Sequence, residues 1–379
     1  MTADAGEIAL TARNASIEDL VALLRGQQAR KVDVVAPAPA IRAEGGLLVL
    51  VGTEPVLGAD GVTMTAGRYR PTDVCDSGIA DKLGIPAAYL KRMRGSRPGL
   101  FDANVNGWLS GDDRSFFVRC LRGDNGQAGT ARAWLSDGYK PIDHLDTLIA
   151  VFDGIRQSGQ DVRIDSCDLT ERRMYVWVRC EAAQVLAPAL LSGYRSPFTG
   201  AAGADNPVVF AGFVVANSET GCGACTVTPR LVAQVCANGM TITRDAVRAV
   251  HLGERLDEGV RWSGDTQDRQ LALVTAKARD AVRAFLSPGY AERVVRELEK
   301  QAGHRLADAA KTVEVISARL RYTEAQQAQI LDHFIKGGDL TAGGIMHAVT
   351  SAAQVQGDGD AAWDLENSAL DALNLAASL

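Results

Sequence analysis

A succession of short runs rich in β-branched and aromatic residues limits the possible folds of this chain more than any other feature. Five of these runs lie between residues 115 and 218 and read as strands. They are SFFVRCLR (115–122), TARAWLSD (130–137), a run near 161–168, RRMYVWVRC (172–180) and PVVFAGFVVANS (207–218). Asn125-Gly126 predicts a hairpin turn between the first two runs.

Helical patterns interrupt and follow these strands. Asp143 can cap a helix whose apolar stripe includes Leu148 and Phe152. After residue 218, TVTP predicts a strand, and RLVAQVCANG predicts a helix ended by Asn238-Gly239. Paired strands followed by a helix, twice over, predict an α+β fold rather than parallel βαβ units. We expect an antiparallel β-hairpin sheet packed with helices, followed by a mostly helical C-terminal region.

The two ends of the chain differ from this strand-rich middle. IEDLVALLRGQQAR (17–30) has apolar residues at helical spacing, LLVLVG (47–52) alternates like a strand, and Thr72 can cap a helix over TDVCDSGIADKLG. From residue 251 onward nearly every segment has a helical pattern with a cap or a glycine stop. We therefore predict an N-terminal α/β region (1–100), a strand-rich core domain (101–250) and a helical C-terminal region with an acidic end (251–379).

Composition and charge exclude several classes of protein. Among the 379 residues no run approaches the roughly 18 apolar residues of a transmembrane helix. The N-terminus MTADAGEIALTARN lacks the parts of a signal peptide, and the seven cysteines are scattered, so we expect a cytoplasmic protein with free thiols. Net charge is −6, and the acids that follow residue 331 account for it. The remaining chain is neutral, which is compatible with nucleic-acid binding by local arginine clusters.

The most specific functional hint is the strand RRMYVWVRC. Because side chains alternate along a strand, its arginines and aromatics at 173, 175, 177 and 179 share one face, and the residues between them face a core. Aromatic rings stack on bases and arginines neutralise phosphates, so this face predicts a nucleic-acid surface. The alternative is that helices cover the face and its arginines pair with acids. The candidate nucleic-acid-binding residues are Arg119, Arg132, Lys140, Arg173, Tyr175, Trp177, Arg179 and Arg230.

A C-x-x-C pair, Cys222 and Cys225, lies in the segment NSETGCGACTVTPRLVAQVCANG (217–239). A structural zinc site needs four ligands, usually two such pairs, and a thioredoxin-type site needs the pair at the start of a helix. Here a single pair precedes a predicted strand. We therefore interpret it as a glycine turn with free thiols, and we predict no metal site and no cofactor. The N–H groups of Gly221 and Gly223, together with Arg230, are the better candidates to meet a phosphate.

Two other functions remain open. Asp137, Asp143 and His144 could converge in a metal-dependent enzyme that acts on nucleic acid, although Asp137-Gly138 also reads as a turn and Asp143 as a helix cap. A structural or interaction protein is the third possibility. The sequence contains no GxxxxGK[ST] or GxGxxG phosphate loop and no G-x-S-x-G nucleophile motif, so ATP-driven work, dinucleotide chemistry and that kind of hydrolase are not expected.

Several stretches resemble the phage/plasmid-like protein family, a domain of unknown function common in actinobacterial, phage and plasmid genomes. The resembling residues are LGIPAAYLKRM (83–93), NVNGW (104–108), ARAWLSDGYKPIDHLD (131–146), FVVANSETGCGACTVTPRLVAQVCANGMTI (213–242) and HLGERLDEGVRWSGDT (251–266). The family pattern has a glycine-rich turn after NSETG without a cysteine pair, so this sequence departs from it there. The architecture is also similar to that of phage single-strand annealing proteins of the Redβ, RecT and Erf type, which form rings or filaments on DNA.

These observations lead to one hypothesis. We expect a single-stranded DNA binding or annealing protein of phage or plasmid type, oligomeric as a ring or filament and acting in recombination or replication. The arginine and aromatic strand face would hold the DNA. The acidic C-terminal end would limit non-specific binding or recruit a protein partner.

Overall fold

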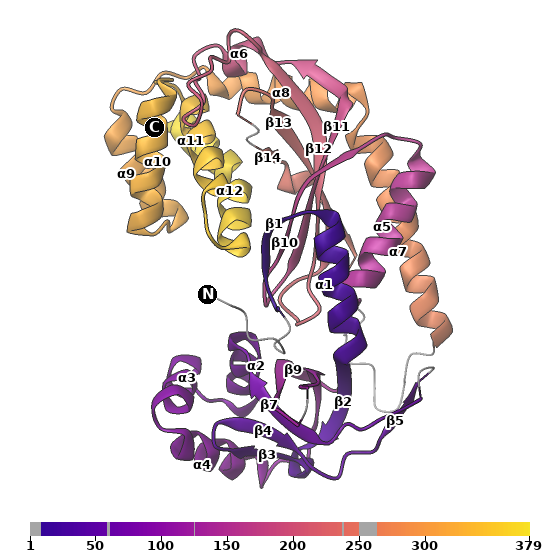
Figure 1. Ribbon diagram of the computed structural model, residues 1–379. Coiled ribbons are helices and arrows are strands. Elements are labelled where there is room, and N and C mark those ends of the chain that lie inside the picture. Colours follow the sequence, from indigo (N-terminus) through magenta and orange to yellow (C-terminus); the bar gives the residue numbers. More distant parts are fainter. Residues whose placement is uncertain (1–8, 59–60, 125, 237–238, 250–263) are drawn as a thin grey trace.

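The chain folds around two mainly antiparallel β-sheets, each covered by helices (Figure 1). This computed structural model describes residues 9–58, 61–124, 126–236, 239–249 and 264–379. The α+β fold class expected from the sequence is confirmed, as is a helical C-terminal region. Over the described residues no helix is long and apolar enough to cross a membrane.

The larger sheet, sheet A, has seven strands and is antiparallel throughout. Its order is β1-β10-β11-β12-β13-β14, with β15 also paired to β13. The strands are β1 (Ala12–Ala15), β10 (Arg163–Leu169), β11 (Met174–Leu186), β12 (Val208–Asn217), β13 (Cys225–Ala233), β14 (Gly239–Thr241) and β15 (Val247–Ala249). The alternation predicted for β11 is confirmed, because Met174, Val176 and Val178 lie in the main hydrophobic core.

Sheet B has six strands in the order β2-β8-β9-β7-β4-β3, and only the β7–β9 pair is parallel. The strands are β2 (Lys31–Pro37), β3 (Ile41–Glu44), β4 (Leu47–Leu50), β7 (Gly67–Pro71), β8 (Ser115–Leu121) and β9 (Gly129–Ser136). One face carries Leu48, Tyr69 and Val118 and packs against the helices α2 (Asp73–Leu83), α3 (Ala87–Ser96) and α4 (Pro98–Leu109). A separate two-stranded sheet joins β5 (Val56–Gly58) to β6 (Gly61–Thr63).

Helices surround sheet A on both sides. On one side lie α5 (His144–Ser158) and α7 (Gly264–Phe285), and on the other a group formed by α9 to α12 (Figure 1). The remaining bounds are α1 (Ile17–Arg30), α6 (Pro188–Leu191), α8 (Pro288–Ala302), α9 (Ala309–Leu320), α10 (Glu324–Gly337), α11 (Ala342–Gln354) and α12 (Gly359–Ser378). The α11 helix is almost entirely buried, which fits its apolar and small side chains.

Most local predictions agree with these elements. Ile17–Arg30 is the first helix, and the Thr72 side chain caps α2 by accepting from the Cys75 N–H group. The β8–β9 hairpin is present, and Gly126 has the left-handed φ of 80° that its turn requires, whereas Asn125 lies outside the described residues.

The prediction of a helix over RLVAQVCANG is wrong. Residues up to Ala233 continue strand β13, which pairs with β12 on one side and with β14 and β15 on the other. A strand buried on both faces reads as a continuous apolar run, and periodicity alone does not distinguish such a run from a buried helix. Gly239 begins β14 instead of ending a helix, and Asn238 lies outside the described residues.

The predicted boundary at residue 100 does not coincide with the sheets. Sheet B combines β2, β3, β4 and β7 with β8 and β9, which follow residue 100, and β1 from the N-terminal region pairs with β10 in sheet A. The three-part division into domains therefore remains a prediction, and each of the two sheets contains strands from both sides of residue 100.

Candidate functional site

The arginine and aromatic face of β11 is covered in the structure. Tyr175 is 0% and Trp177 is 5% exposed, because Trp363 of α12 packs on them in a small aromatic cluster. The ring centroids of Tyr175 and Trp363 lie 5.3 Å apart, and the Tyr175 hydroxyl donates to Asp360 at 2.7 Å. The expectation of an open aromatic face is thus wrong, and the alternative that helices cover this face is confirmed.

The arginines of this face have partners within the protein. Nε of Arg173 donates to the carbonyl of Cys222 at 3.0 Å. Arg179 lies 3.2 Å from Asp165, and Arg230 lies 3.1 Å from Glu366. A phosphate would have to replace these internal acceptors, so none of the three guanidinium groups is available to DNA in this arrangement. Lys140, by contrast, is exposed.

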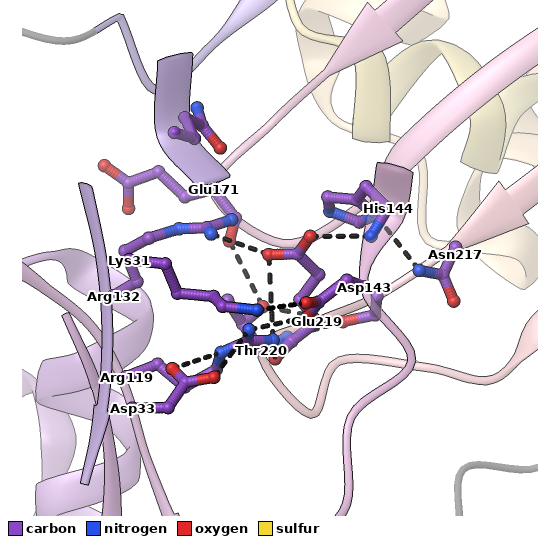
Figure 2. Close-up of polar contacts among 12 residues, drawn as sticks. Lys31, Asp33, Arg119, Arg132, Asp143, His144, Glu171, Asn217, Glu219 and Thr220 are labelled. Carbon is purple, nitrogen blue, oxygen red and sulfur yellow. Dashed lines mark hydrogen bonds and ion pairs between the residues drawn. The ribbon is translucent and has the colours of Figure 1, made fainter. Parts of the chain in front are cut away.

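Arg119 and Arg132 belong to a buried ion cluster between the two sheets (Figure 2). Arg119 is 1% exposed and lies within 3.7 Å of three carboxylates. The acids come from different elements: Asp33 from β2, Asp143 from the start of α5, and Glu219 from the β12–β13 loop. Arg132 pairs with Glu219 at 2.6 Å, and Lys31 pairs with Asp143. Neither arginine can reach a nucleic acid, so their predicted role as phosphate contacts is wrong for this arrangement.

The segment Asn217–Thr220 joins this cluster to α5. A carboxylate oxygen of Glu219 accepts the backbone N–H of His144 at 2.7 Å, in the first turn of the helix. Asp143 holds the N-cap position as predicted, yet its side chain makes no cap hydrogen bond and binds Arg119 and Lys31 instead. Glu219, from the β12–β13 loop, therefore provides the acceptor for an N–H group in the first turn of α5, in place of the Asp143 side chain.

The charges of the ion cluster compensate one another. Lys31, Arg119 and Arg132 face the acids Asp33, Asp143 and Glu219 (Figure 2). Burial alone would raise the pKa of the Glu219 carboxyl, but the imidazole of His144, which is protonated only below about pH 4, and the two arginines outweigh this effect and lower it. We interpret this cluster as a set of buried ion pairs that holds the two sheets together. Removing one member of such a buried pair typically lowers the free energy of unfolding by about 3–5 kcal/mol.

His144 is held neutral inside this region. Burial lowers the pKa of its imidazole to about 4. The amide nitrogen of Asn217 donates to the carbonyl of Ile142 at 2.9 Å and lies 3.1 Å from Nδ1 of His144. Nδ1 therefore acts as the acceptor, and the ring proton is assigned to Nε2.

The cysteine pair lies at the start of β13. Cys222 is half-buried and Cys225 is buried, and burial raises the pKa of the Cys225 thiol to about 12. The pair precedes a strand, as the sequence indicates, and both thiols are free.

The residues of the alternative metal-dependent enzyme have other local roles. Asp137 is exposed in a turn, where its carboxylate accepts the N–H of Gly138 at 2.9 Å. Asp143 and His144 are engaged as described above. Among the described residues no group of three or more His, Cys, Asp or Glu side chains is placed to hold a metal ion.

A cleft of about 750 Å³ opens between the two sheets beside the ion cluster. Its walls are α2, the end of β9, the β10–β11 turn, the β12–β13 loop and the residues before α12. Lys82 and Lys91 line it next to the acids Asp81 and Asp73 at 2.9 Å and 3.2 Å. Glu171 adds a further acid to the lining, and burial raises the pKa of its carboxyl. The cleft is thus mixed in charge, without the excess of cations that a polyanion requires.

One group of arginines was missed by the sequence reasoning. Strand β4 lies between β3 and β7. Val49 of β4 pairs with Arg42 of β3 on one side and with Arg68 of β7 on the other, so these three residues lie on the same face of sheet B. Arg70 follows two residues after Arg68 on the same face. All three arginines are exposed, because α2 to α4 cover only the opposite face. We call Arg42, Arg68 and Arg70 the open arginine face; the alternation of GRYRP was the available signal.

The fold and site define the chain as an α+β protein whose two mainly antiparallel sheets are joined by a buried ion cluster. No family model, no curated protein and no solved structure matches the chain.

Proposed function

We propose that the protein binds single-stranded DNA through the open arginine face of sheet B. The proposal rests on the three exposed arginines of β3 and β7, the two strands that flank β4. The strands β3, β4 and β7 together contain one acid, Glu44. Arg68 lies 3.8 Å from Glu44, and both side chains are at least half exposed. Such a pair is worth at most about 1 kcal/mol, so a phosphate can compete for the guanidinium group.

The shape of this surface favours a single strand. One side of the sheet packs on helices and the other presents arginines around Val49, which gives a strand of DNA a cationic path across adjacent β-strands. Val51, which follows β4, is 45% exposed and adds apolar contact area for bases. Phosphate neutralisation supplies most of the affinity in such a mode, with little dependence on base sequence.

The wider biological proposal follows the resemblance described above. We infer a cytoplasmic protein of the phage/plasmid-like family that acts in annealing, recombination or replication as a ring or filament. The acidic end is not a detached tail, since Asp360 and Glu366 bond to sheet A. Any partner of this region would therefore meet a folded helical surface. Native mass spectrometry with and without single-stranded DNA tests the oligomeric state.

The binding surface is tested by charge reversal. We expect Arg42→Glu with Arg68→Glu to weaken binding to a labelled oligonucleotide of about 30 residues at least tenfold by fluorescence anisotropy. The slope of log K against log salt should flatten by about 0.7 for each phosphate contact removed. Arg269→Glu is the matched control, because Arg269 is 79% exposed on α7 and pairs only with Asp265 in the described part of the chain. Equal affinities and slopes for the double variant and the control would refute the proposal.

A further inference from the structure

A two-stranded arm extends from sheet B. We call residues 51–66, which join β4 to β7, the β5–β6 arm; in the described part of the chain, its two strands pair only with each other. Two large apolar side chains of the arm, Val62 and Met64, are 68% and 60% exposed. A hairpin of two strands is marginally stable in water and needs a further strand or a helix to pack against. Within the described residues, no element covers these two side chains.

The root of the arm is held in place by hydrogen bonds. Thr65 is buried, and its Oγ1 lies 2.9 Å from Oγ1 of Thr53 and 2.8 Å from the carbonyl oxygen of Glu54. The hydroxyl of Tyr69, on β7, donates to the carbonyl of Thr65 at 3.3 Å. The arm therefore leaves the sheet in a defined direction, and this preorganisation reduces the entropy that is lost when a partner binds.

Helix α4 has an apolar face that the described residues leave open. Its inward side chains belong to the core of sheet B, whereas Leu100 and Trp108, eight residues apart and so on one side of the helix, are 44% and 58% exposed. Ala103 and Gly107 lie between them and are also exposed. The one charged residue of α4, Asp102, bonds instead to the turn between β3 and β4. A helix that is apolar on both sides is normally covered on both sides. We call Leu100, Ala103, Gly107 and Trp108 the outward α4 face.

The arm and the outward α4 face are complementary, but they lie apart in one chain. Figure 1 shows β5 on the opposite side of sheet B from α3 and α4, so the arm does not meet the α4 helix of its own chain. The sequence of the arm contains two acids and no base, and Glu54 is exposed. Arg92 of α3 and Arg97 at the start of α4 are exposed as well, and neither pairs with an acid in the described part of the chain. Opposite charges thus border two apolar surfaces.

We propose that the β5–β6 arm of one copy of this chain packs on the outward α4 face of a second copy. The α4 helix then provides the packing partner that an isolated hairpin needs, and Val62 and Met64 cover Leu100 and Trp108. Because the two surfaces differ and lie on opposite sides of one sheet, the contact is head-to-tail and repeats from copy to copy into a ring or a filament. The inference rests on the oligomeric part of the proposed function and names the surfaces that make the oligomer.

The test is sedimentation velocity of the full chain over a concentration series, with and without single-stranded DNA. Wild type should form species larger than a dimer. Trp108→Glu and Met64→Glu each place a charge in the contact and should weaken self-association by at least about tenfold. An equimolar mixture of these two variants should form a 1:1 dimer and nothing larger, because one intact arm and one intact outward α4 face remain between them. Leu273→Glu is the matched control, since Leu273 is 52% exposed on α7.

The outcomes separate this contact from the proposed DNA surface. A wild-type chain that stays monomeric with and without DNA, or assembly unchanged in both variants, overturns the inference whatever the DNA result. A mixture of the variants that stays monomeric overturns it too, provided that both keep the near-ultraviolet circular dichroism of wild type. A monomer that binds anionic lipid vesicles through Trp108 overturns it in favour of a membrane surface. Assembly that survives Arg42→Glu with Arg68→Glu but not Met64→Glu supports it even if DNA binding is absent.

Discussion

At the scale of single residues, three arginines of the predicted DNA surface are buried in the fold: Arg119, Arg132 and Arg230. Arg119 reads from the sequence as a strand arginine of a surface, but it is 1% exposed and surrounded by three carboxylates. The acids that neutralise it, Asp33, Asp143 and Glu219, are 86, 24 and 100 residues away along the chain, and each belongs to a different element. Alternation shows which face of a strand a residue occupies. It does not show which distant acid will face that residue, so the sequence left pairing and DNA contact as two open alternatives.

His144 gives a prediction at this scale. Its pKa is lowered by burial from 6.5 to about 4, so the unfolded chain binds more protons between these values and stability falls as pH drops through that window. From pH 7.5 to pH 5 the loss due to His144 is about 2 kcal/mol. Urea unfolding at both pH values should show a smaller pH-dependent loss in His144→Gln than in wild type.

The pH range excludes the two acidic neighbours whose pKa values are lowered, and the raised pKa values of the partly buried Asp33 and Asp146 act in the opposite direction, stabilising the fold as the pH falls. The lowered pKa values of Asp143 and Glu219 contribute stability that is present above about pH 4.5 and is lost only below it. The same pH-dependent loss in both proteins would show that His144 is not held neutral by the fold.

At the scale of elements, most of the secondary structure is local information. Alternation and caps predicted β8, β9, β11, β12 and α2 close to their observed positions. The error at 230–239 arose because β13 is sandwiched between β12 and other strands, and both its faces are apolar. Its strand conformation depends on pairing partners on both sides, which a single-segment pattern does not reveal.

Close packing of β11 against β12 gives the element-scale prediction. A Cβ at Gly212 would approach the Val178 carbonyl oxygen to 2.3 Å, and backbone on a central strand cannot easily give way. We expect Gly212→Ala to lower the free energy of unfolding by about 1–3 kcal/mol in urea titration. Gly107→Ala on α4 is the control. No atom lies within 4 Å of its added Cβ, so it should be neutral or stabilise by up to about 1 kcal/mol. Equal effects would contradict the packing argument.

At the scale of the whole molecule, α12 decides what sheet A can bind. This helix brings Trp363 onto Tyr175 and Trp177, and its residues Leu365, Ala369 and Leu373 belong to the main hydrophobic core. The acidic end predicted as a regulator of DNA binding is thus an integral layer of the fold. Its removal would expose core as well as the aromatic face.

Truncation before α12 tests this view. We expect a chain ending at residue 357 to lose its cooperative unfolding transition and its near-ultraviolet circular dichroism, because a large apolar core becomes exposed. Full-length protein at the same concentration is the control. A truncated chain that folds and gains DNA affinity would show that the β11 face is a DNA site which α12 blocks.

The sequence by itself determined the α+β class, the alternation of β11 and the helical C-terminal region, because these depend on short-range periodicity and caps. Only the tertiary structure decided that α12 covers the β11 face, that Arg119 and Arg132 meet acids between the sheets, and that exposed arginines gather on β3 and β7. Each of these outcomes depends on which segments, distant along the chain, pack together. Burial and charge compensation arise from that packing and are not encoded in any one segment.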